Sequence, residues 1–189
     1  LIVRVQSHPG FYYLLCLNLQ RFRHAALGMG DANDYFESAE AAQQANLPVE
    51  ARKLLDAGYT AGLLGQGALA AEHNKLRTLV TRQAIEDDAV INNAAAAARV
   101  SREPVALVHW GMSFVAAGKV EQGLALLEEA LTKPTLKRID DVRLRLGAAY
   151  ALAGRKEQAI KTLQAVKGAD GTSNIAHLWL LNLQTAAAK

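Results

Sequence analysis

The chain has 189 residues, of which 51% are hydrophobic and 21% are charged, with a formal net charge of +3 at pH 7. This apolar content excludes a disordered chain, and the mild charge disfavours nucleic-acid binding, which needs a denser basic patch. The single cysteine, Cys16, excludes an internal disulfide bond, and no apolar run reaches the roughly 18 residues that span a membrane. Because the chain begins without Met, we expect a fragment or a processed form, and its compartment stays open.

The first segment, residues 1–30, is predicted to be helical, part of a longer repeat array, and to end at the helix breakers Gly28–Asp31. The polar residues Asp31, Asn33 and Asp34 begin like a calcium loop, but the central glycine and the terminal glutamate of such a loop are missing. A helix N-cap explains them better, so we expect a repeat helix to begin here.

Four repeat units follow, and the first two are predicted to be the less regular ones. In the unit 31–66, a short turn at Asn46–Pro48 separates two helical stretches, and Ala51 opens the second. The unit 67–103 keeps the spacing of the chain, but its pattern is weak near Asp87, where a small residue is expected. We still predict one pair of helices for each unit.

The units 104–138 and 139–167 repeat one pattern at a spacing of 36 residues. Spacings of this size are typical of stacked helical repeats, in which each pair of helices buries its apolar face against the next pair. We expect Gly111 and Gly147 to lie where two helices nearly touch. The aligned positions are Gly111 with Gly147, Phe114 with Tyr150, Gly118 with Gly154, Gly123 with Ala159 and Leu127 with Leu163.

The last element, residues 172–189, is predicted to be a capping helix with an apolar face that includes Trp179. Apolar residues recur at every third or fourth position along the chain, and no sustained alternation of apolar and polar residues predicts a strand. The sequence therefore predicts an all-α fold.

These units resemble the tetratricopeptide repeat, and the resemblance covers about residues 31–166. It implies a right-handed α-solenoid of antiparallel helix pairs that binds other proteins. The whole chain is also similar to repeat proteins of proteobacteria, a likeness that implies no particular activity. The matching residues are Gly111, Phe114, Gly123, Ala130 and Pro134, then Gly147, Tyr150, Ala159 and Leu163, and earlier Ala39, Ala51 and Leu55.

The resemblance implies a groove lined by the first helix of each pair, and we expect a protein or peptide partner to bind there. We predict a non-catalytic scaffold, with two alternatives: a self-associating structural domain, or a helical accessory domain of a larger enzyme or assembly. A third possibility is that the C-terminal helix fills the groove. The predicted groove residues are Val105, Val108, His109, Met112, Val115, Leu144, Arg145 and Ala148.

No catalytic, cofactor-binding or metal-binding constellation is found in the sequence. The five histidines stand far apart, and none has a second His or Cys at the spacing of a metal site. A basic cluster within residues 133–145 has two interpretations. It binds an acidic peptide or carboxylate, or it is a solvated edge of the repeat array. The cluster contains Lys133, Lys137, Arg138, Arg143 and Arg145.

Overall fold

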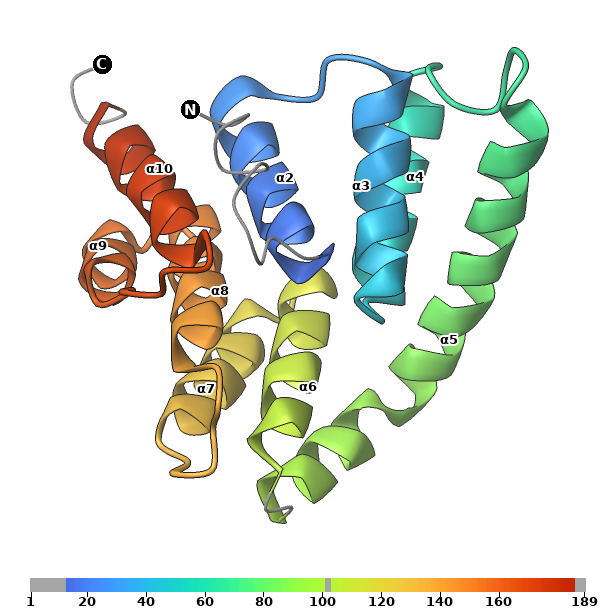
Figure 1. Cartoon of the computed structure of the whole chain (residues 1–189). Coiled ribbons are helices and arrows are strands. Elements are labelled where there is room, and N and C mark those ends of the chain that lie inside the picture. The colour runs from blue at the N-terminus through green and yellow to red at the C-terminus, as the bar shows by residue number, and fades with distance from the viewer. Residues whose placement is uncertain (1–12, 101–102, 186–189) are drawn as a thin grey trace.

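The computed structural model describes residues 13–100 and 103–185, and every regular element within these ranges is an α-helix (Figure 1). The prediction of an all-helical chain is therefore confirmed for the described residues. The helices in chain order are α2 (Tyr13–Leu27), α3 (Ala32–Gln44), α4 (Pro48–Thr60), α5 (Ala70–Val100), α6 (Pro104–Ala116), α7 (Val120–Leu131), α8 (Ile139–Leu152), α9 (Lys156–Gln164) and α10 (Thr172–Thr185).

Three pairs of helices, α3 with α4, α6 with α7 and α8 with α9, are joined by the same short turn. In each turn one residue has a positive φ: Asn46 (57°), Gly118 (82°) or Gly154 (74°). The next residue donates its backbone N–H to a carbonyl in the last turn of the preceding helix, at 2.9 Å in all three cases. This bond belongs to a Schellman motif, which ends a helix at a left-handed residue. The turn thus recurs in the 36-residue register that the sequence shows.

Helix α3 begins at a side-chain cap. Asp31 Oδ1 accepts the backbone N–H of Asp34 at 3.0 Å, and Asp31 itself has an extended backbone. The interpretation of these polar residues as an N-cap rather than a calcium loop is confirmed.

Glycines let the paired helices approach closely. A Cβ atom on Gly111 would lie 2.9 Å from Cγ of Leu127, and one on Gly147 would lie 2.6 Å from Cγ of Leu163. The predicted close approach at Gly111 and Gly147 is confirmed. At Gly123 the close neighbours are backbone atoms of α6, which a Cβ would meet at 2.6 and 2.8 Å.

Helix α5 departs from the prediction. It is one helix of 31 residues, whereas we predicted an antiparallel pair for the unit 67–103. The position that carries the turn in the other pairs is occupied by Arg82, which lies 36 residues after Asn46 and 36 before Gly118. Arginine disfavours a positive φ and is a good helix former, so the helix continues through this position. The unit keeps its length in sequence but not its turn.

Helix α2 is the element that the repeat pattern does not account for. It lies between α3 and α10 and also packs against α8 (Figure 1). Its side chains are buried around most of the helix, with Leu15, Leu19 and Phe22 at 0%, 1% and 7% exposure. Such all-round burial is typical of a helix inside a fold rather than on its surface.

Candidate functional site

Two hollows lie along the seam between α6 and α8, where α2 also contributes to the walls. The large hollow has a volume of about 650 Å³ and includes Leu14 of α2. The small hollow has a volume of about 290 Å³ and includes Arg21, which lies two turns further along the same face of α2. Arg145 of α8 lines both hollows, so they are neighbours along the seam.

Seven of the eight predicted groove residues line one or both of these hollows. The exception is Leu144, which is fully buried and lines neither. Val105, Val108, His109 and Arg145 line the large hollow, and Met112, Val115, Arg145 and Ala148 line the small one.

The predicted residues differ in how much of each side chain a partner can reach. Val105 is 67% exposed, whereas Val108 and Met112 are each 5% exposed and belong to the hydrophobic core. A charge at Val108 or Met112 would therefore disturb the core, and only Val105 offers a large exposed apolar surface in the large hollow.

Arg145, the residue that lines both hollows, forms a buried ion pair. Arg145 Nη2 lies 2.7 Å from Asp141 Oδ2, and the two side chains are 11% and 7% exposed. Within the described residues, Arg145 Nε is buried without a hydrogen-bond partner. Burial lowers the pKa of the neighbouring His109 below its ordinary value of 6.5, and the charge of Arg145 lowers this pKa further. His109 is therefore a neutral, polar side chain at neutral pH.

Four of the five residues in the basic cluster pair with carboxylates, so most of its positive charge is already neutralised. Lys137 is the member that forms no ion pair within residues 13–100 and 103–185. The pairs are Lys133 with Glu129, Arg138 with Asp170, Arg143 with Asp140 and Arg145 with Asp141, at 2.7 to 3.1 Å.

Helix α2 is tied to α4 by a largely buried ion pair. Arg21 donates from Nε and Nη2 to the two carboxylate oxygens of Glu50 at 2.7 and 2.6 Å. Its third nitrogen donates to Asn18 Oδ1 at 2.8 Å. This two-point geometry fixes the direction of both side chains, and hence the wall that they form beside the small hollow.

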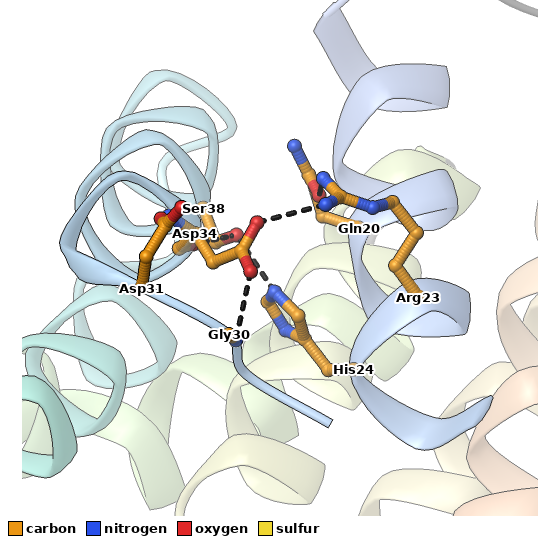
Figure 2. A network of polar contacts seen from close by, with 7 residues as sticks. All are labelled: Gln20, Arg23, His24, Gly30, Asp31, Asp34 and Ser38. Atoms are coloured by element: carbon orange, nitrogen blue, oxygen red, sulfur yellow. Dashed lines mark hydrogen bonds and ion pairs between the residues drawn. The ribbon is translucent and has the colours of Figure 1, made fainter. Parts of the chain in front are cut away.

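A second polar network fixes α2 against α3 (Figure 2). Asp34 accepts from Arg23 Nη2 and from the backbone N–H of Gly30, each at 2.8 Å. The Gly30 bond and the Arg23 charge lower the pKa of Asp34 in spite of its burial. Ser38 Oγ donates to the Asp34 carbonyl at 2.6 Å, so it accepts from His24 Nε2 at 2.9 Å.

The imidazole of His24 predicts a loss of stability in mild acid. Burial lowers its pKa below 6.5, and the charge of Arg23 acts in the same direction, against the opposing charges of Asp34 and Glu50. As the pH falls through 6.5, the unfolded chain takes up a proton at this residue before the folded chain does, so folding becomes less favourable. The His24→Gln variant has an amide at this position, which can donate a hydrogen bond but takes up no proton. We therefore expect this variant to lose less stability than the wild type when the pH is lowered.

Urea denaturation at about pH 7.5 and about pH 5 measures this difference, because an ordinary histidine changes its charge between these values. The higher pH is the internal control, since His24 is neutral there in both states. An equal loss of stability in both proteins on acidification would contradict the assignment.

Several residues that line the hollows were not predicted to do so, and some of them come from outside the late repeats. Among these are Leu14 and Arg21 of α2, Leu47 before α4, and Glu50 and Lys53 of α4. The segment around Cys16 is rich in leucine, and its leucines cover more than one face of the helix, a pattern typical of a buried helix. That pattern predicts that α2 is buried, but it does not predict which helices pack against α2.

Among the described residues, no group of three or more His, Cys, Asp or Glu side chains is arranged to hold a metal ion. Within the same part of the chain, no helix is both long and apolar enough to cross a membrane.

Residues 141–170 match the family model of the tetratricopeptide repeat. The match begins in α8, contains α9 and ends before α10. No curated protein and no solved structure gave a significant match, so the likeness to repeat proteins of proteobacteria stays a prediction. By this match and by the turn that it shares with the two other pairs, the α8–α9 pair is similar to a repeat of the tetratricopeptide type.

Proposed function

We propose that the protein is a non-catalytic scaffold that binds a protein or peptide partner in the large hollow. Tetratricopeptide and related repeats generally present such surfaces to other proteins. The observation that carries the proposal is the large hollow itself, of about 650 Å³, with the exposed Val105 in its wall. Exposed apolar side chains in a concave site are typical of places where a partner docks.

The lining of the large hollow favours a partner with one apolar side chain next to an acidic one. Leu136, which is only partly buried, lines the same hollow as Val105 and adds apolar surface to it. Lys137 lies in the same lining without an ion pair in the described parts of the chain, so it is available to an incoming carboxylate. A peptide with this pair of side chains satisfies both kinds of surface.

Selection of a displayed peptide library on the purified chain, followed by fluorescence polarisation of the selected peptides, tests the proposal. We expect Val105→Glu to weaken peptide binding about tenfold, since it removes apolar contact and repels an acidic peptide. Because Val105 is 67% exposed, the melting temperature should stay near that of the wild type.

Val90→Glu is the matched control, since Val90 lies on α5, is 48% exposed and lines neither hollow. It should bind the selected peptides as the wild type does. Equal binding by the Val105→Glu and wild-type proteins would place the peptide elsewhere and refute the site.

A self-associating structural domain is the second candidate, and the exposed side of α5 favours it. Three large apolar side chains of this helix are exposed: Ile85 at 60%, Val90 at 48% and Val100 at 86%. Light scattering across a range of concentrations separates the candidates. A dimer that Val90→Glu dissociates supports self-association, whereas a monomer that binds selected peptides supports the scaffold.

A further inference from the structure

The lining of the small hollow contains more cationic than anionic side chains. Arg21, Lys53 and Arg145 line it together with one carboxylate, Glu50, which is already paired with Arg21. Lys53 is exposed and forms no ion pair in the described ranges, and Arg145 Nε is buried without a hydrogen-bond partner. Arg145 is already paired with Asp141, so the exposed Lys53 is the group that an incoming anion can pair with in this lining.

The other residues that line the small hollow are apolar. They include Met112 and Val115 of α6 and Leu152 of α8, together with small residues such as Ala148. The small side chains on α8 leave the space open, because a larger residue at these positions would occupy it. One hollow thus combines cationic donors on α2, α4 and α8 with an apolar surface on α6 and α8.

We propose that the small hollow binds a small monocarboxylic acid with an apolar chain. The carboxylate pairs with the exposed Lys53, and the apolar chain lies against the apolar residues of the lining. A monoanion fits better than a phosphate dianion, because the charge of Glu50 in the same lining repels additional negative charge.

The size of the hollow supports a free small acid over a peptide segment. A volume of about 290 Å³ corresponds to about ten water volumes of ~30 Å³, and so to a ligand of about ten non-hydrogen atoms. The proposal is independent of the peptide site, because the exposed donor Lys53 and these apolar residues belong to the small hollow alone.

Isothermal titration calorimetry of the full chain with sodium octanoate, below its micelle concentration, tests the proposal. We expect saturable uptake of one octanoate per chain. Octan-1-ol has the chain without the charge, and acetate has the charge without the chain. Each should bind far more weakly than octanoate at the same concentration. Absence of saturable octanoate uptake, or equal uptake of octan-1-ol, would overturn the proposal.

Two exposed substitutions locate the ligand without disturbing the core. Lys53→Gln should weaken octanoate binding about tenfold through loss of the ion pair. Leu152→Glu should abolish it, because it replaces a 57% exposed part of the apolar lining with a like charge. The matched controls, Lys75→Gln on α5 and Leu181→Glu on α10, lie outside the hollow and should bind octanoate as the wild type does.

The four variants should share the wild-type melting temperature, because all four side chains are exposed. Wild-type affinity in Lys53→Gln or in Leu152→Glu would refute this site, and so would an equal loss in either control. Failure of the octanoate titration leaves the peptide measurements on Val105→Glu unaffected, so the two proposals fail separately.

Discussion

Replacement of Trp179 by alanine is expected to lower the free energy of unfolding by about 4 kcal/mol. Trp179 is 1% exposed, and its ring meets that of Phe22 edge to face, with centroids 5.6 Å apart. This contact joins α10 to α2, two helices at opposite ends of the described chain. Truncation leaves a cavity at the place where the two ends of the array meet, and the surrounding helices close it only in part.

Urea denaturation measures the change, and Trp110→Ala is the matched control. Trp110 lies on α6 and is only partly buried, so its truncation should cost clearly less. A double-mutant cycle with Phe22→Leu should return a coupling of about 1 kcal/mol between the two rings. If Trp179→Ala costs no more than Trp110→Ala, then α10 does not hold α2 in the way described.

The regular part of the fold could be predicted from sequence because each local signal repeats. Gly118 and Gly154 mark the same turn in two pairs, and Asn46 marks it in the first, since these residue types tolerate a positive φ. Where Arg82 takes the same position, the signal is absent and the chain forms one helix instead of two. The spacing alone predicted a pair there, but a turn depends on the residue that makes it.

The place of α2 could not be predicted, because it depends on contacts between distant segments. Arg21 meets Glu50 and Phe22 meets Trp179, and neither contact follows the 36-residue register. We considered a groove that is open or filled by the C-terminal helix, but it is α2 that lies beside both hollows.

The position of α2 also changes the candidate site. The helical spacing of residues along α6 predicted which side chains face the seam between α6 and α8. Seven of the eight predicted residues line a hollow there. The same spacing predicted that Val108 and Met112 are open to a partner, but both side chains are buried. The residues left accessible, Val105 above all, are therefore those on which a binding test depends.

Replacement of Gly123 by alanine is expected to destabilise the protein by about 2 kcal/mol. A Cβ atom here would lie 2.6 Å from the carbonyl oxygen of Gly111 and 2.8 Å from the backbone nitrogen of Val115. Backbone atoms cannot rotate away, so α6 and α7 must separate, which costs up to about 3 kcal/mol. The higher helix propensity of alanine returns about 1 kcal/mol of this.

Gly147→Ala is the informative comparison, because the same substitution meets a different neighbour. Its Cβ would lie 2.6 Å from Cγ of Leu163, a side chain that shifts more readily than a backbone, so the cost is smaller and the propensity gain offsets more of it. Gln122→Ala, on the exposed side of α7, should change stability by no more than about 0.5 kcal/mol. Urea denaturation of the three variants should rank Gly123→Ala as the least stable. If Gly123→Ala and Gly147→Ala are equally stable, then α6 and α7 separate at Gly123 at no greater cost than the Leu163 side chain shifts at Gly147. That result would contradict the prediction for Gly123.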